Sequence, residues 1–256
     1  MPKPPKSSST LTPEQKKIIT RRNFLSFATL GFGALGGVLG WNWVRKQPSV
    51  DGTVAPLRTM LETNGFLNET VLYSNAHLAP EYPRSAAAAE PRTNGDVGLD
   101  EDIDAGDWKL TITDTKSGKP LELVLADIMA LPKTEIVFDF KCVEGWNEIQ
   151  HWGGVRLSEV FRKYDLPTDF RYVGMATPDK AYYVGLDMAS ALHPQTLLAY
   201  ESNGQEISFE QGYPLRLIVP VKYGIKNIKR IGSIILTNER PPDYWAEQGY
   251  DYHAGL

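Results

Sequence analysis

Glycine and proline divide the apolar residues of this chain into short runs. The chain has 256 residues, of which 22 are glycine and 18 are proline, and many of these stand between apolar stretches. A strand needs only about five residues, whereas a packed helix usually needs about ten or more. The sequence therefore predicts many short strands and structured loops rather than a helical bundle. We expect a mixed α+β domain whose sheets are antiparallel or mixed.

Local periodicity predicts where the individual elements lie. A strand running into a loop is expected at 71–80, and further strands at 108–113, 121–125, 136–142, 171–177, 181–186, 197–201, 215–221 and 231–237. Short helices are expected at 125–131, 155–164 and 187–192. Asn203-Gly204 is typical of a tight hairpin turn. The stretch 151–154 is expected to be a turn, and His151 and His193 are expected to be structural.

Composition divides the chain into four parts. Residues 1–22 form a polar tail, 23–46 an apolar helix, 47–70 a linker and 71–256 the main domain. This length accommodates one domain of good size. Within it, the acidic stretch 95–106 is expected to be a solvated loop. The net charge of -4 differs from the basic composition of nucleic-acid-binding proteins, so we expect no nucleic-acid partner.

The N-terminal part carries an export signal. Arg21-Arg22 is followed by one variable residue and then Phe24-Leu25, which matches the twin-arginine motif. The twin-arginine translocase is therefore an expected partner. This route moves folded proteins, which suits a protein that receives its cofactor in the cytoplasm.

The segment after the arginines is long enough to cross a membrane. Residues 24–44 carry no charge, and a helix of that length spans about 31 Å, close to the hydrocarbon thickness. Cleavage after the segment is one alternative, but no small-x-small site is evident before Pro48. We therefore expect a single-pass anchor in the cytoplasmic membrane, with the N-terminus in the cytoplasm and the main domain in the periplasm. A helix buried in the core of a domain is a further alternative, but it is disfavoured because such a helix should show a polar face.

The single cysteine, Cys142, closes an alternating stretch. Ile136, Phe138, Phe140 and Cys142 are expected to face one side of a strand, just before a turn at Gly145. A lone thiol cannot form an internal disulfide. Two interpretations remain open from the residues alone: a small buried hydrophobic side chain, or a sulfur ligand for a soft metal.

Several segments, taken in order, resemble one known family. They are Asn75-Ala76-His77-Leu78, the run 127–132 ahead of Cys142-Val143-Glu144-Gly145-Trp146, the segment 186–198, the run 212–217 and the run 222–229. Together they resemble the sulfite oxidase-type molybdopterin-dependent oxidoreductases. The likeness is strongest to the bacterial exported branch, which includes the catalytic subunit of periplasmic methionine sulfoxide reductase. The resemblance covers about 73–252 and implies the sulfite oxidase-like fold and a molybdenum–molybdopterin cofactor.

The resemblance also implies residue roles. Cys142 would ligate molybdenum as a thiolate. Arg216 would bind the cofactor phosphate, because a guanidinium suits bidentate phosphate recognition. The other implied cofactor contacts are Asn75, His77, Thr177, Gln211, Asn227, Ile228 and Lys229. Two positions depart from the family: the family's sulfite oxidases have arginine at Asn75, and Gln211 is asparagine or histidine elsewhere.

A tyrosine near the C-terminus completes the implied site. Tyr250 stands five residues after Trp245, which matches an active-site tyrosine of the sulfite oxidases, and Tyr252 is the nearby alternative. A phenol there could hydrogen-bond a substrate oxygen. The alternative is that Tyr250 is an aromatic side chain that covers the core.

The implied reaction is a two-electron redox step, most simply oxygen-atom transfer. Glu144 and Trp146 follow the cysteine where sulfite oxidases carry arginines, so the rim is expected to disfavour sulfite and to favour reduction of a neutral S- or N-oxide. Sulfite oxidation remains an alternative, and a metal-free, membrane-tethered binding module is another. The chain carries no Cys-x-x-Cys-His haem motif, so a separate membrane haem or quinol-linked subunit is the expected electron partner.

Overall fold

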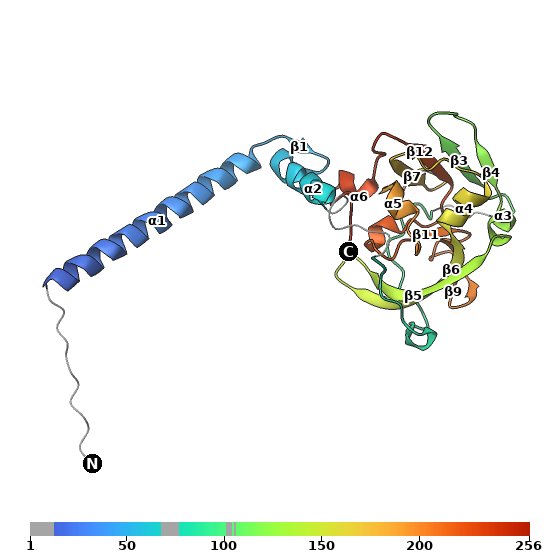
Figure 1. The fold of residues 1–256 in the computed structure, drawn as a ribbon, viewed down its shortest axis with the longest axis horizontal. Coiled ribbons are helices and arrows are strands. Elements are labelled where there is room, and N and C mark those ends of the chain that lie inside the picture. Colours follow the sequence, from blue (N-terminus) through green and yellow to red (C-terminus); the bar gives the residue numbers. More distant parts are fainter. Residues whose placement is uncertain (1–12, 68–76, 101–103, 105) are drawn as a thin grey trace, which may run out of the picture. The chain divides into compact units, whose positions relative to one another are not determined.

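The computed structural model describes residues 13–67, 77–100, 104 and 106–256 (Figure 1). The chain forms two compact units, one made of Met1–Ser49 and Val54–Pro56, and the other of Val50–Thr53 and Leu57–Leu256. The first unit contains α1 (Pro13–Arg45). The second groups most of α2 (Ala55–Leu67) with the main domain, although the sequence predicts a linker at 47–70.

The predicted membrane-spanning segment at 23–46 is not supported. In the part of the chain that the structure describes, no helix combines the length and the apolar character needed to cross a bilayer. Helix α1 covers this segment.

Among the described residues, two five-stranded sheets build the main domain. The first has the order β10-β9-β6-β5, with β11 also pairing with β9, and all its pairs are antiparallel. Its strands are β5 (Lys133–Lys141), β6 (Asn147–Arg156), β9 (Leu197–Ser202), β10 (Gln205–Glu206) and β11 (Arg216–Ile218). The second sheet has the order β4-β3-β12-β7-β8, and only its β3–β12 pair is parallel. Its strands are β3 (Leu110–Asp114), β4 (Leu121–Leu123), β7 (Tyr172–Ala176), β8 (Tyr183–Asp187) and β12 (Ser233–Thr237).

Short helices lie between the strands and after the last one. They are α3 (Leu125–Met129), α4 (Leu157–Lys163), α5 (Met188–Ala191), α6 (Tyr244–Glu247) and the 3-10 turns η2 (Arg84–Ala86) and η3 (Gly224–Lys226). A further small sheet pairs β1 (Ser49–Val50) with β2 (Thr53–Val54). The mixed α+β class is thus confirmed, and so are the helices expected near 125–131, 155–164 and 187–192. The strand expected at 71–80 falls mostly outside the described residues.

The turn predicted at 151–154 is wrong, because these residues belong to the long strand β6. Gly153 and Gly154 lie at a shift in register between β6 and β9. A Cβ atom on Gly154 would lie 2.1 Å from the Leu198 carbonyl oxygen, so the two backbones approach too closely for any side chain. The glycine pair therefore marks a bulge inside a strand, not its end.

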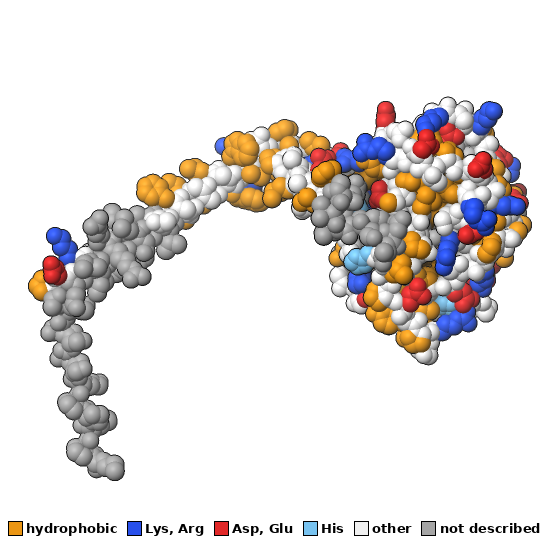
Figure 2. All heavy atoms as spheres, viewed as in Figure 1, with side chains coloured by type: hydrophobic (Ala, Val, Ile, Leu, Met, Phe, Trp, Pro, Cys, Tyr) orange, Lys and Arg blue, Asp and Glu red, His pale blue; other side chains and the backbone are white. Residues whose placement is uncertain are grey.

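The first sheet has a hydrophobic core on each face. The larger cluster joins alternate residues of β9 and β11 to neighbouring helices and the second sheet. The smaller cluster contains Ile136, Phe138, Phe140 and Cys142, which confirms the predicted alternation and places the sulfur at the end of β5. On the face shown in Figure 2, acidic and basic side chains are interspersed over the domain surface.

Candidate active site

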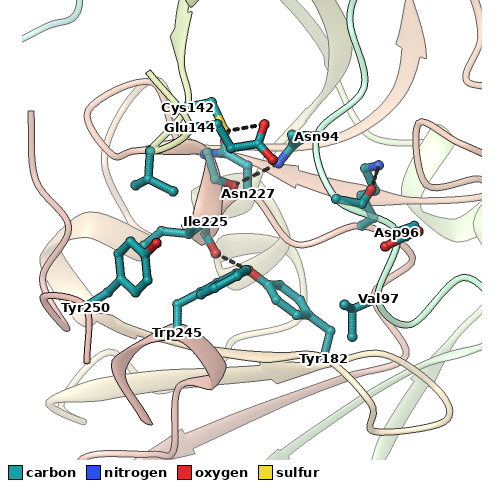
Figure 3. Close-up of a pocket in the computed structure, with 14 residues that line it drawn as sticks. Asn94, Asp96, Val97, Cys142, Glu144, Tyr182, Ile225, Asn227, Trp245 and Tyr250 are labelled. Atoms are coloured by element: carbon teal, nitrogen blue, oxygen red, sulfur yellow. Dashed lines mark hydrogen bonds between the residues drawn. The ribbon is translucent and has the colours of Figure 1, made fainter. Parts of the chain in front are cut away.

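A cavity of ≈ 120 Å³ opens beside the end of β5. Four residues predicted for the site border it: Cys142, Asn227, Lys229 and Tyr250. Cys142 and the aromatic pair Trp245 and Tyr250 approach it from different sides (Figure 3). The remaining lining residues are Asn94, Gly95, Asp96, Val97, Val143, Glu144, Tyr182, Gly224 and Ile225.

A tight turn presents the sulfur of Cys142 to this cavity. The Gly145 amide donates to the Cys142 carbonyl at 3.1 Å, and the Cys142 amide donates to the Trp146 carbonyl at 2.9 Å. Gly145 has a φ of 87°, a conformation that favours glycine. The turn therefore follows directly from the end of β5 and holds the thiol at the cavity edge.

The Cys142 thiol is a poor acid in the protein alone. Burial raises its pKa, and the carboxylate of Glu144, 3.5 Å from the sulfur, acts in the same direction. A bound metal cation reverses this balance, because coordination deprotonates a thiol outright. The site therefore suits a thiolate only when a cation is present.

Glu144 is held as an anion at the rim. Its carboxylate accepts a hydrogen bond from the Trp146 indole nitrogen at 2.7 Å. That bond, followed by the one from the Cys142 thiol, lowers the pKa of Glu144. The Trp146 ring stacks on Phe140, and its centroid lies 4.6 Å from the Arg92 guanidinium. Arg92 thus adds one cation to a rim that the sequence presents as acidic and aromatic.

The opposite wall is aromatic. The rings of Trp245 and Tyr250 meet edge to face, with centroids 5.1 Å apart. The Tyr182 hydroxyl donates to the Ile225 carbonyl at 2.6 Å, and burial raises the pKa of Tyr182. Tyr250 remains 40% exposed. Its phenol is therefore the accessible hydroxyl on this wall.

Lys229 also borders the cavity. Its ammonium donates to the Gly95 carbonyl at 2.7 Å. Burial, reinforced by the nearby charge of Arg216, lowers the pKa of Lys229 to about 7. Gly212, with a φ of 105°, packs so closely that an added Cβ would lie 2.7 Å from the Lys229 Cβ. An anion entering here would restore the charge of Lys229.

Arg216 is fully buried near Lys229. It donates to the carbonyl and side-chain oxygens of Gln211 at 2.9 and 3.0 Å, and to the Asn227 carbonyl at 3.2 Å. Burial lowers its pKa to about 9. Its Nε has no hydrogen-bond partner among the described residues. Gln211 also donates from its Nε2 to the Pro91 carbonyl at 2.9 Å.

The loop after η3 is fixed by its own hydrogen bonds. The Asn227 side chain accepts from the Val219 amide at 2.6 Å and donates to the Tyr223 carbonyl at 3.1 Å. Ile228 packs in the larger core, and its carbonyl accepts from the Leu217 amide at 2.8 Å. A direct role for Ile228 would therefore fall to its backbone alone.

Besides Gln211, Arg216 and Ile228, two more predicted residues in the described part of the chain, Thr177 and His77, do not line this cavity. Thr177 is buried, and its hydroxyl donates to the Asp179 carboxylate at 2.5 Å and accepts from the Tyr182 amide. Thr177 thus supports the backbone of Tyr182 and does not itself line the cavity. His77 is exposed and borders a separate cavity of ≈ 520 Å³. Asn75 lies outside the described residues.

The segment 94–97 is a part of the site that sequence reasoning missed. The acidic composition of 95–106 predicts a solvated loop, yet Asn94 to Val97 line the cavity, and Leu99 is buried. Gly98 has a φ of 82° and would bring a Cβ within 2.6 Å of Thr177. A glycine between acidic residues is the one available hint of such a close approach.

We expect the stability of the cofactor-free protein to depend on pH through Lys229. Its pKa is about 7 in the folded state, against an ordinary lysine pKa of 10.5, so the unfolded chain binds the extra proton between those values. Stability therefore rises with pH across that window. Lys229→Met removes this titrating group. The urea midpoint of the variant minus that of the wild type should therefore be largest below pH 7 and should decrease towards pH 10. Exposed Lys119→Met serves as the control, and equal pH slopes for wild type and Lys229→Met would refute the assignment.

Comparison with known proteins places these features in one family. The model of the oxidoreductase molybdopterin binding domain matches residues 96–245. A protein of Azospira oryzae named as a protein-methionine-sulfoxide reductase subunit, YedZ1, is 37% identical over 186 residues, covering 72% of this chain and 70% of the relative. The protein-methionine-sulfoxide reductase catalytic subunit MsrP of Campylobacter jejuni is 30% identical, covering 96% of this chain and 83% of its own.

A solved structure shares the fold. The crystal structure of the sulfane dehydrogenase SoxCD from Paracoccus pantotrophus matches with a TM-score of 0.51 and 19% sequence identity. The match covers 65% of this chain and 46% of that one, so this chain spans less than half of its length.

Proposed function

Because the chain belongs to the oxidoreductase molybdopterin-binding domain family, we propose that this molybdopterin-dependent enzyme reduces a neutral S- or N-oxide, most favourably a sulfoxide. The reaction consumes two electrons and two protons, breaks the bond from sulfur or nitrogen to oxygen, and releases the reduced compound and water. The observation that carries this proposal is the shared cavity of Cys142 and the ionised Glu144. The names of the two curated relatives, both methionine-sulfoxide reductase components, support the substrate class.

The residues present fit the family's cofactor. A thiol is a soft ligand for a metal that already carries sulfur ligands. Lys229, with its lowered pKa, and Arg216, with an unpartnered buried Nε, are donors that an anionic tail would satisfy. When bound, the cofactor supplies a metal that changes oxidation state by two electrons and exchanges an oxygen atom. We propose that Cys142 ligates that metal, that Arg216 binds the cofactor phosphate, and that Gln211, Asn227 and Lys229 hold the rest of the pterin cofactor.

Tyr250 is the proposed hydrogen-bond donor to the substrate oxygen. Its phenol is accessible at the cavity wall, across from the thiol. A donor placed where charge develops on oxygen stabilises the transition state more than the ground state. Trp245 packs edge to face on the same ring and so limits the directions in which the phenol can point. The wall is otherwise apolar, which suits the carbon substituents of a sulfoxide.

The rim selects against anionic substrates. Glu144 carries a negative charge beside the sulfur, and the Arg92 guanidinium, which lies over the Trp146 ring, offsets part of that charge. A sulfite dianion entering this rim meets like charge, which costs affinity, whereas a neutral oxide meets none. The charge pattern therefore favours reduction of an oxide over oxidation of sulfite.

We expect the two half-reactions to differ strongly in rate when they are assayed with artificial electron carriers. Oxide reduction should exceed sulfite oxidation in kcat/KM by at least about tenfold, a difference of about 1.4 kcal/mol. Glu144→Gln should narrow the ratio by improving sulfite turnover. The surface acid variant Glu159→Gln, in α4, should leave it unchanged. Faster sulfite oxidation than oxide reduction by the wild type would overturn the proposed direction.

A separate electron donor and an extracytoplasmic location belong to the same proposal. Both curated relatives carry the word subunit in their names, which supports a second, electron-transferring protein. Arg21-Arg22 and the motif around it support export by the twin-arginine route. Cell fractionation tests the location. The double variant Arg21→Lys, Arg22→Lys should be retained in the cytoplasm. Unchanged export of this variant would refute the proposed twin-arginine route.

A further inference from the structure

We infer that Arg58 is a positioning residue for the aromatic wall of the active site, a role that rests on the function proposed for Tyr250. Arg58 lies in α2, far from Tyr250 in sequence. The segment that contains it is expected from sequence to be a linker. In the structure, its guanidinium instead reaches the backbone of the wall that faces the cavity.

The contacts of Arg58 are specific. The side chain is 4% exposed. Nη1 donates to the Tyr250 carbonyl at 3.1 Å, and Nη2 donates to the Ala246 carbonyl at 2.5 Å. Nη2 also donates to the Asp51 carbonyl. One buried cation thus joins the start of the main domain to both ends of the turn that carries Tyr250.

That turn depends on outside donors for its shape. The Tyr250 amide donates to the Trp245 carbonyl at 3.0 Å, and the Gly249 amide donates to the Ala246 carbonyl at 3.1 Å. These bonds curl the chain back after α6 and leave the Tyr250 carbonyl to an outside donor. Arg58 binds this carbonyl and shares the Ala246 carbonyl with Gly249. The Tyr250 carbonyl is partly buried, and a carbonyl left unpaired away from water is costly, so the turn would shift without the guanidinium.

A close backbone contact independently links the segment before α2 to the turn that carries Tyr250. Gly52 has a φ of 73°, and a Cβ placed there would lie 2.6 Å from the Glu247 carbonyl oxygen. Gly249 has a φ of 96°, and a Cβ there would lie 3.2 Å from the Gly52 carbonyl oxygen. Two glycines therefore allow the segment that begins the main domain to lie directly against the end of α6. This contact and Arg58 brace the same wall.

The brace matters because a hydrogen-bond donor must be placed accurately. A misplacement of about 1 Å in an active site can cost roughly 100-fold in rate. We expect Arg58→Met to lower kcat for oxide reduction by roughly 10- to 100-fold, with a smaller change in KM. Molybdenum content should be unchanged, because Arg58 touches none of the residues proposed to hold the cofactor. Arg58→Lys, which can still reach one carbonyl, should retain intermediate activity and protects the test against misfolding of the methionine variant.

The matched control is Arg240→Met. Arg240 borders the same surface cavity as Arg58, but it pairs with Glu62 at 3.3 Å and lies over the Tyr252 ring.

Arg58→Met should also be combined with Tyr250→Phe. If Arg58 acts through the Tyr250 hydroxyl, the double variant loses little beyond Tyr250→Phe alone. Full additivity of the two losses would overturn the inference.

A readout that does not depend on turnover separates this inference from the proposed function. Amide hydrogen exchange on the holoprotein should be faster across 244–250 in Arg58→Met than in wild type, and unchanged there in Arg240→Met. Unchanged exchange in Arg58→Met overturns the inference. If the wild type reduces no oxide, the proposed function fails, while faster exchange at 244–250 still supports the positioning role.

Discussion

Cys142→Ser is expected to yield a folded protein that lacks molybdenum and activity. The oxygen of serine is a harder ligand than a thiolate and is not deprotonated as readily, so it does not replace the soft ligand that the metal requires. Mutations in residues that merely support a metal ligand already cost about 10- to 100-fold, and loss of the ligand itself should cost no less than about 100-fold in kcat. Metal analysis and oxide-reduction assays on the purified full-length protein measure both effects.

Wild-type protein from cells grown without molybdate is the matched reference for this variant. The serine hydroxyl replaces a group of similar size at a site that borders a cavity. The variant and the molybdenum-free wild type should therefore unfold at similar temperatures. Both unfolding temperatures should be lower than that of the molybdenum-loaded enzyme, since a ligand that binds only the folded state raises the melting point. A serine variant with normal molybdenum and turnover would end the assignment of Cys142 as ligand.

Local pattern is sufficient where one face of a strand is buried. The alternation of Ile136, Phe138, Phe140 and Cys142 predicts a strand with its sulfur facing inwards, and those four residues share one cluster. Strand β6 was missed because Gly153 and Gly154 carry no side chains to continue its pattern. Their reason for being glycine is the packing against β9, which lies more than forty positions later in the chain. Long-range packing of this kind is not encoded in a local period.

The candidate site was likewise predicted from sequence only in part. Cys142, Asn227, Lys229 and Tyr250 border one cavity, as the family resemblance implies, although they lie far apart in sequence. Asn94 and Asp96 were missed because nothing in their local sequence distinguishes them from surface loop residues, and Tyr182 because its local sequence predicts only a strand. The resemblance places the run 222–229 in the site, whereas a basic run is more often solvated. Its cations Lys222, Lys226 and Lys229, and Arg230 just after it, are all buried.

The largest loss of stability is expected from Lys226→Met. Lys226 is fully buried and forms an ion pair with Asp243, which is 3% exposed. Its ammonium also donates to the Gly185 carbonyl at 2.9 Å and lies 4.3 Å from the Tyr252 ring centroid. Removing one partner of a buried pair leaves the other charge uncompensated, which typically costs about 3–5 kcal/mol. Urea unfolding followed by fluorescence measures the change in unfolding free energy.

The partner residue provides a sharp internal control. Asp243 accepts from the Gly185 amide at 3.1 Å and from the Ala246 amide at 3.0 Å, and the side-chain amide introduced by Asp243→Asn retains one oxygen acceptor without the charge. Adding Asp243→Asn to Lys226→Met should therefore recover part of the lost stability. Lys109→Met, which breaks the exposed pair with Glu122, should leave the urea midpoint unchanged. A loss for Lys226→Met no larger than that of Lys109→Met would show that the buried pair is not what stabilises this region.

The same ion pair joins the two halves of the active-site wall. Lys226 ends η3, whose neighbours Ile225 and Asn227 line the cavity, while Asp243 caps α6, which carries Trp245. Arg58 holds the outer side of the α6 turn, and Asp243 holds its start. Lys226→Met at low urea should therefore lower oxide reduction before global unfolding begins, because the wall loosens before the two sheets separate. Loss of activity and loss of fluorescence at the same urea concentration would show instead that wall and sheets form one cooperative unit.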